Sequence, residues 1–156
     1  MSIGGSLSDQ LGARIGEIKE AVAGLSDEQA SSPRGEGEWC VKEVLSHILG
    51  DQATLQRFRR FVQEDNPELS VNPGVSYYDQ SRQGSDLGDL VSSIESDYGE
   101  IGRFLAGVTD EQLARTAHVP LLKQTPLGEY PTLAQWAGFL VNVHLTQHVG
   151  QLRALT

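Results

Sequence analysis

The sequence predicts an all-α fold, a four-helix bundle with long crossover loops. Two features predict it: four segments carry apolar residues at spacings of three and four, and turn-rich stretches separate these segments. The length of 156 residues suits one continuous apolar core, whereas two domains of half that size would each be marginal. We therefore expect one domain that spans residues 1–156.

Each helix is expected where the apolar spacing is sustained. The first runs from about Ser6 to Gly24, the second covers residues 41–62, and the third covers residues 87–108. The fourth opens at Thr132, whose hydroxyl can accept a hydrogen bond from the backbone of Gln135 while the Gln135 side chain reaches back. This helix is expected to continue to the last residue.

Two connections are rich in turn-forming residues. Residues 65–85 contain many Asn, Pro, Gly, Ser and Tyr residues without a sustained period, which predicts a long loop, and such loops are usually functional or mobile. Residues 115–131 contain three prolines and a glycine. Within them, residues 118–122 are expected to pair briefly with residues 127–130 as a small hairpin.

The composition argues against several classes of protein. The net charge of -9 opposes binding to nucleic acid, because a polyanion would be repelled and the basic cluster of Arg57, Arg59 and Arg60 is short. No apolar run approaches the roughly 20 residues that span a bilayer, so we expect no membrane segment. The single cysteine, Cys40, excludes an intramolecular disulfide, and no charged leader precedes an apolar stretch. A reducing cytoplasm is the expected location.

Three histidines are expected to meet inside the bundle. His144 and His148 are four residues apart, so they project from one face of the fourth helix, and the apolar residues of that helix turn this face toward the core. His47 lies on the apolar side of the second helix. At 1.5 Å per residue, His47 lies about 12 Å from the start of its helix and the pair about 13 Å from the end of theirs. Antiparallel packing would therefore bring all three to one level.

A divalent metal ion is the ligand that these histidines favour. A buried imidazole nitrogen without a partner costs about 1 to 3 kcal/mol, whereas a shared ion satisfies all three rings and leaves a position open for water or substrate. Zinc, nickel and iron are equally compatible with imidazole ligands. The alternative is a neutral histidine network that is hydrogen-bonded to Asp51, Gln147 or Gln151.

Two charged residues of the second helix are candidates for roles in catalysis and binding. Asp51 lies one turn after His47 and can act as a fourth ligand, as an acceptor that orients a ring N–H or as the catalytic general base, with a solvated carboxylate as the plain alternative. Arg57 can clamp an anionic group of a cofactor, although the helix dipole alone favours arginines near this helix end. Gln151 is a weaker candidate for orienting a ligand.

Other residues have structural explanations as strong as functional ones. Cys40 lies near the start of the second helix, where the dipole lowers a thiol pKa, but it lies about 10 Å from His47 along the axis and is expected to be a packed side chain. Tyr77 and Tyr78 either close over the site as a lid or anchor the long loop. His118 is expected to be exposed to solvent.

The residues around the histidines resemble a known family. Residues 39–47 read Trp-Cys-Val-Lys-Glu-Val-Leu-Ser-His, and residues 144–152 read His-Leu-Thr-Gln-His-Val-Gly-Gln-Leu. A helix that begins with tryptophan and carries the first histidine, followed by a last helix with two more, is similar to the DinB/YfiT-like superfamily of metalloenzymes. The resemblance implies long crossover connections, a metal site formed by His47, His144 and His148, and a homodimer.

The resemblance also implies an activity, because several relatives are thiol-dependent transferases or isomerases that use mycothiol, bacillithiol or glutathione. A divalent ion held by three neutral imidazoles keeps its charge and can hold a thiol as the thiolate, ready to attack an electrophile. We therefore expect a metal-dependent thiol S-transferase or isomerase that acts on a small electrophile. Two alternatives stay open: a metal-dependent hydrolase, since the same ion can activate water, and a non-catalytic metal-binding bundle.

Overall fold

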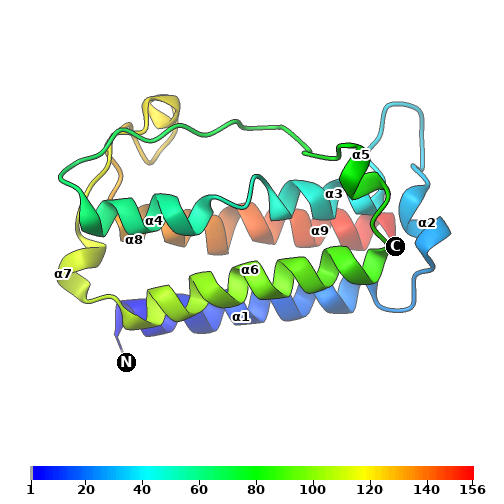
Figure 1. Ribbon diagram of the computed structural model, residues 1–156, viewed down its shortest axis with the longest axis horizontal. Helices are drawn as coiled ribbons and strands as arrows, with labels where there is room; N and C mark the ends of the chain where they lie inside the picture. Colours follow the sequence, from blue (N-terminus) through cyan, green and yellow to red (C-terminus); the bar gives the residue numbers. More distant parts are fainter. Residues whose placement is uncertain (1) are drawn as a thin grey trace.

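Four long helical rods form the structure, a computed structural model that describes residues 2–156 (Figure 1). The second and fourth rods are each divided into shorter elements. In chain order the rods are α1 (Ile3–Val22); α3 (Val41–Leu49) with α4 (Thr54–Gln63); α6 (Leu87–Gly107); and α8 (Leu133–Phe139), a π-helical turn (Leu140–His144) and α9 (Leu145–Leu155). The predicted all-α four-helix bundle is confirmed.

Short helical elements lie between the rods: α2 (Asp27–Ser31), α5 (Gln80–Gln83), α7 (Asp110–Leu113) and a 3₁₀ turn (Pro120–Leu122). The first rod begins earlier than expected, because Ser2 is its N-cap and accepts a hydrogen bond from the backbone of Gly5. Thr132 caps α8 as predicted. Its hydroxyl accepts from Gln135 N at 3.1 Å, and Gln135 Oε1 accepts from Thr132 N at 2.9 Å.

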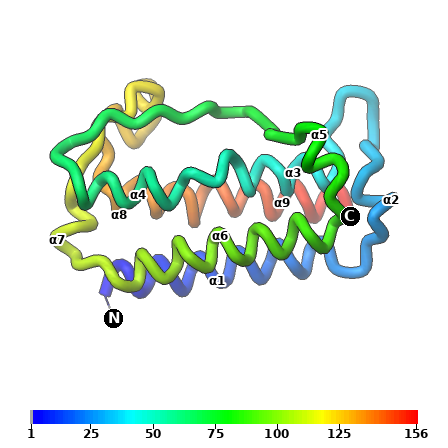
Figure 2. Tube along the Cα trace, in the orientation of Figure 1, coloured from blue at the N-terminus to red at the C-terminus, as the bar shows by residue number. Residues whose placement is uncertain are grey.

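The order of the rods requires a long connection (Figures 1 and 2). The α1 rod runs antiparallel to α6, and the α3–α4 rod runs antiparallel to the α8–α9 rod. Residues 64–79 cross from the end of α4 to α5, so that α6 points in the same direction as the α3–α4 rod. Both α1 and α3 pack against α6 and α9. The long crossover and the antiparallel packing of the two histidine-bearing rods are therefore as predicted.

One apolar core joins the four rods. Fully buried side chains come from each of them, such as Leu11 of α1, Phe58 of α4, Leu105 of α6 and Leu152 of α9. Burying one such side chain contributes about 1.5 to 3 kcal/mol to folding. These apolar side chains therefore pack against one another inside the bundle. Within residues 2–156 no helix combines the length and the hydropathy of a membrane span.

The second rod is broken where the sequence predicted one continuous helix. Gly50 follows the last residue of α3 with a φ of 63°, a left-handed conformation that glycine adopts without strain. Side chains from other helices donate hydrogen bonds to the free backbone carbonyl groups at this helix end. Tyr98 of α6 donates its hydroxyl to Ile48 O at 2.7 Å, and Arg82 of α5 donates to Ser46 O at 2.9 Å and to Gly50 O. These contacts fix the end of the helix that carries the first histidine.

A π-helical turn changes the buried stripe of the fourth rod. The buried residues are Leu133, Ala137 and Val141 up to this turn, and Leu145, Val149 and Leu152 after it. The sequence placed His144 and His148 within the fully buried arc, but both side chains are half-buried and line a cavity. A π turn adds one residue to the repeat and so re-aims the side chains after it, and such turns are frequent at functional sites.

The connection between α7 and α8 differs from the predicted hairpin. Backbone hydrogen bonds join residues 115–119 to residues 129–133, for example Val119 N to Glu129 O at 2.8 Å. Residues Pro120–Leu122 form a 3₁₀ turn instead, because proline lacks the N–H that would continue the pairing. In the described part of the chain, residues 2–156, this pairing forms one isolated bridge, between Thr116 and Thr132, and no regular strand.

His118 is half-buried rather than exposed. Its Nδ1 lies 3.2 Å from Glu68 Oε1, its Nε2 lies 3.2 Å from Glu129 Oε2, and its ring stacks on that of Tyr130. Sequence reasoning could not find Glu68, because it belongs to the distant crossover loop. His118 therefore ties the crossover loop to the segment before α8.

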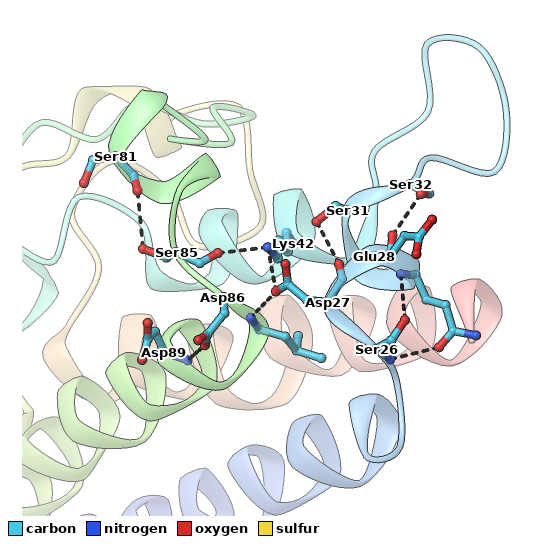
Figure 3. A network of polar contacts seen from close by, with 12 residues as sticks. Ser26, Asp27, Glu28, Ser31, Ser32, Lys42, Ser81, Ser85, Asp86 and Asp89 are labelled. Atoms are coloured by element: carbon cyan, nitrogen blue, oxygen red, sulfur yellow. Dashed lines mark hydrogen bonds and ion pairs between the residues drawn. The ribbon is translucent and has the colours of Figure 1, made fainter.

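Lys42 joins three elements at the α2 end of the bundle (Figure 3). Although charged, its side chain is only 2% exposed, and its Nζ donates to Asp27 Oδ1 at 2.8 Å and to Ser85 O at 2.9 Å. Asp27 Oδ1 also accepts from Leu87 N, the first residue of α6, at 2.8 Å. The hydrogen bond from Lys42 is the main cause that lowers the pKa of Asp27 below its ordinary value of 3.8.

Candidate metal centre

Three histidines converge where α3 packs against the last rod. His47 lies in α3, His144 ends the π-helical turn, and His148 lies in α9. Each ring offers one nitrogen atom, and the three atoms lie within 4.8 Å of one another. Nε2 of His47 lies 3.2 Å from Nε2 of His144. Among residues 2–156, no other group of three or more His, Cys, Asp or Glu side chains converges in this way.

The outer nitrogen atoms of two rings face oxygen acceptors. Nδ1 of His47 lies 2.7 Å from the backbone oxygen of Val75, and Nδ1 of His148 lies 2.9 Å from Oε1 of Gln151. Because a carbonyl oxygen can only accept, both Nδ1 atoms donate a proton and both Nε2 atoms keep a free lone pair. Metal-ligating histidines typically have an oxygen acceptor of this kind on the outer nitrogen.

The ring of His144 stays neutral near pH 7. Burial, together with the neighbouring His148 and His47, lowers the pKa of His144 to about 4. Burial also lowers the pKa of His148. Nδ1 of His144 is buried and has no hydrogen-bond partner within residues 2–156. Near pH 7 these two rings therefore carry no charge that would repel a cation.

The free lone pairs of these residues fit a divalent cation. In a hydrogen-bonded network, Nε2 of His144 can donate one proton, whereas Nε2 of His47 and Nε2 of His148 each have a free lone pair. One of these two lone pairs therefore stays without a donor. A cation accepts all three lone pairs. Two ligand atoms at about 2.1 Å from a tetrahedral zinc ion would be about 3.4 Å apart. The 3.2 Å between Nε2 of His47 and Nε2 of His144 is close to this spacing and also suits an N–H···N hydrogen bond.

Asp51 and Arg57 bind each other beside the triad. Arg57 donates through Nη1 to Asp51 Oδ1 at 3.1 Å, through Nη2 to Asp51 Oδ2, and through Nε to Ser70 O at 3.1 Å. The hydrogen bond from Arg57 lowers the pKa of Asp51. The acceptor that faces the His47 ring is Val75, not Asp51. A catalytic role for Asp51 and an anion-binding role for Arg57 stay predictions, and each would require this pair to separate.

Cys40 is buried at the start of α3, whereas Tyr77 of the long loop lines the cavity. Cys40 is the N-cap of α3 and is 2% exposed. Burial raises the pKa of Cys40, since desolvation of a thiolate outweighs the effect of the helix start, and this agrees with a packed side chain. Tyr77 lines the cavity, whereas Tyr78 is half-buried and its pKa is raised by burial to about 12.

A cavity of about 820 Å³ opens beside the triad, and all three histidines line it. Both tryptophans of the chain, Trp39 and Trp136, line it as well, and the Trp39 ring centroid lies 5.3 Å from that of His47. Residues 71–74 of the crossover loop complete the lining. The volume lies within the range of small-molecule sites, about 300 to 1,000 Å³.

Sequence reasoning missed two groups that shape this centre. The oxygen of Val75 gives no signal, because every residue has a backbone carbonyl and only the folded loop brings this one to His47. Arg82 lies in α5, within the stretch that the sequence predicted as a long loop, and its contact with Ser46 of α3 joins residues 36 positions apart. The contact of Gln151 with His148 could be anticipated from the sequence, since Gln151 follows His148 by three residues on a helix.

The fold and the site together define a helical bundle with a histidine triad beside a cavity. The chain belongs to the DinB superfamily, which it matches over residues 10–152. It is also similar in structure to YfiT from Bacillus subtilis, described as a probable metal-dependent hydrolase with an unusual four-helix bundle topology. The TM-score is 0.79 and the identity 22%, over 97% of this chain and 85% of that chain, so this likeness shows the fold. No curated protein matches the sequence.

Proposed function

We propose that this protein is a metal-dependent enzyme that joins a low-molecular-weight thiol, such as mycothiol, bacillithiol or glutathione, to a small electrophile. His47, His144 and His148 would hold a divalent ion, and zinc, nickel and iron all suit three imidazole ligands. The observation that carries the proposal is the convergence of three ring nitrogen atoms within 4.8 Å at the wall of a cavity.

The composition of the site favours a thiol over water as the nucleophile. When bound, the ion would supply a positive charge that stabilises the thiolate form of the nucleophile. A free thiol has a pKa of about 8.5, far below the value of about 15.7 for water, so it needs less help to ionise. Within residues 2–156 no carboxylate belongs to the cluster of three ligand nitrogen atoms. Asp51, the nearest candidate in the sequence, is bound to Arg57 and its pKa is lowered.

The remaining residues would hold and shield the reactants. Val75 and Gln151 accept from His47 and His148 and so orient these two rings. Trp39 packs beside His47, and Tyr77 of the crossover loop lines the same cavity. Shielding of this kind limits the access of water, which would otherwise compete for the electrophile.

A metal-dependent hydrolase is the second candidate. It is favoured by the structural similarity to YfiT, described as a probable metal-dependent hydrolase. The same three histidines would serve, with a water molecule in place of the thiol. A non-catalytic metal-binding bundle is the third candidate, and in that case the ion would only stabilise the fold.

Conjugation of monochlorobimane to each thiol, measured with and without added metal, tests the proposal. We expect conjugation with one of the three thiols that needs the metal and is lost in His148→Ala. Gln147→Ala is the matched control, because Gln147 is exposed on the same helix as His148, and it should retain the activity. Hydrolysis of p-nitrophenyl acetate that needs the metal and His148, without any thiol conjugation, would favour the hydrolase. Metal binding without either activity would favour the non-catalytic bundle.

We also propose a homodimer in the cytoplasm, as the resemblance to DinB/YfiT-like proteins implies. Size-exclusion chromatography with light scattering should give twice the chain mass of 16.9 kDa. A mass equal to that of one chain at micromolar concentration would remove the dimer from this account.

A further inference from the structure

The cavity beside the triad has two chemically different ends. On the last rod, the residues that line it are Trp136, Phe139 and Leu140, followed by His144, His148 and Gln151. The first three are apolar and the last three are polar. At 1.5 Å per residue, the middle of the apolar group lies about 11 to 12 Å along the axis from the middle of the His144/His148 pair. The cavity therefore extends along the rod, with the histidines toward one end.

The apolar end is extended by residues from another segment. Leu121 and Leu122 line the cavity, and they belong to the connection that lies at the α4–α8 end of the bundle (Figure 1). Leu121 is 50% exposed, so it lies where the cavity meets the solvent. The apolar wall thus reaches from the last rod to the outer rim of the cavity.

Several polar groups of the lining form hydrogen bonds inside the protein. Tyr98 donates its hydroxyl to Ile48 O at 2.7 Å, and Thr125 donates its hydroxyl to Leu122 O at 2.6 Å. Gln151 accepts from His148. Thr54, Asn72 and Tyr77 also line the cavity with polar side-chain groups.

The charges of the lining compensate each other. Within residues 2–156 the lining contains two charged side chains, Asp51 and Arg57, and these form a two-pronged ion pair. At the apolar end, away from the triad and the ion it would hold, a carboxylate or phosphate on a ligand would have to displace Asp51 from Arg57, and an ammonium group would have to displace Arg57 from Asp51. Both exchanges sacrifice a charge-assisted pair that is already made.

We infer that the substrate with which the thiol reacts has a neutral apolar body that occupies the end of the cavity lined by Trp136, Phe139 and Leu140. This inference rests on the proposed function only in taking the triad as the reacting end. The polar body of the thiol would then lie at the rim, beside Asn72 of the crossover loop, which is exposed. Each further methylene group of a ligand chain should tighten binding about fourfold until the apolar end is filled.

The two tryptophans provide a direct test, because both line this cavity. Energy transfer from tryptophan to the neutral probe N-phenyl-1-naphthylamine would be titrated with purified full-length protein. The matched anionic probe is 8-anilinonaphthalene-1-sulfonate, which has the same ring system and one sulfonate. We expect the neutral probe to bind at least tenfold more tightly. We also expect n-alkanols of four to eight carbons to displace it with affinities that rise about fourfold per methylene.

Variants locate the binding to the apolar end. Leu140→Asn should weaken binding of the neutral probe at least tenfold, whereas Val143→Asn, in the same π-helical turn but outside the lining, should leave it unchanged. If Leu140→Asn unfolds the protein, Leu121→Asn at the exposed rim replaces it, with an expected loss of threefold or more. Equal or tighter binding of the anionic probe would overturn the inference. So would neutral-probe binding that none of the folded lining variants weakens.

The probe assay needs neither metal nor turnover, so the two proposals can fail separately. Tight binding of the neutral probe without any conjugation activity would contradict the proposed function and support the apolar site. Metal-dependent conjugation without selective binding of the neutral probe would do the opposite.

Discussion

Replacing Gln151 should weaken metal binding although this residue is not a ligand. Its Oε1 lies 2.9 Å from Nδ1 of His148, so Gln151→Leu removes the acceptor that fixes the ring and leaves a ring N–H without a partner. Loss of such an outer partner typically lowers metal affinity by about 10- to 100-fold. Because the helix around His148 is otherwise unchanged, we expect the lower end, about tenfold, which corresponds to about 1.4 kcal/mol.

The affinity would be measured by competition with a fluorescent zinc chelator. Gln151→Glu should bind at least as tightly as the wild type, since a carboxylate is a stronger acceptor for the same ring N–H. Gln147→Leu is the matched control, because Gln147 is exposed on the same helix, and it should bind normally. A Gln151→Leu affinity within twofold of the wild type would refute the idea that this residue positions His148.

Two further predictions concern stability. Tyr98→Phe should lower the free energy of unfolding by about 1 to 3 kcal/mol, because the carbonyl of Ile48 loses its donor in a buried place, while Tyr130→Phe at an exposed position should change it by less than about 0.5 kcal/mol. Urea titrations with unchanged slopes measure both variants, and equal midpoints for the two would contradict the role of the Tyr98 hydroxyl. Lys42 lowers the pKa of Asp27 in the folded state, so this ion pair should stabilise fully above about pH 4 and lose its effect as the pH falls through the lowered pKa. Asp27→Asn should lack this part of the acid dependence, and an unchanged dependence of the urea midpoint between pH 5 and pH 2 would argue against it.

The helices and the meeting of the histidines were predictable because both depend on local periodicity. Apolar residues three and four apart mark the buried faces, and the spacing of His144 and His148 places them on one side of their helix. The height of His47 along its own helix then fixed the antiparallel direction of the two rods, and the structure has this direction.

Features that depend on backbone geometry were not predictable in the same way. The apolar spacing continues across the break at Gly50, since Leu45, Leu55 and Phe58 are all buried, so periodicity could not show that the helix stops. The π-helical turn before His144 also gives no signal in the sequence. It shifts the buried stripe of the helix by one residue, and apolar residues still lie on the inner side.

The partners of side chains from distant segments were the least accessible part of the site. Asp51 was a reasonable acceptor for His47, because both lie on the same predicted helix one turn apart. In the structure Arg57 binds Asp51, and Val75 from the crossover loop takes the position beside the His47 ring. A loop without periodicity gives no sequence signal of where its backbone oxygen atoms will lie.

The most direct test of the metal centre is the metal content of protein purified without an affinity tag, measured by mass spectrometry for the wild type and for His47→Ala. The convergence of His47 with His144 and His148 predicts about one divalent ion per wild-type chain and a loss of most of it in the variant. An equal metal content in the two proteins, or none in wild-type protein supplied with zinc, nickel and iron, would contradict the centre on which the proposed function depends.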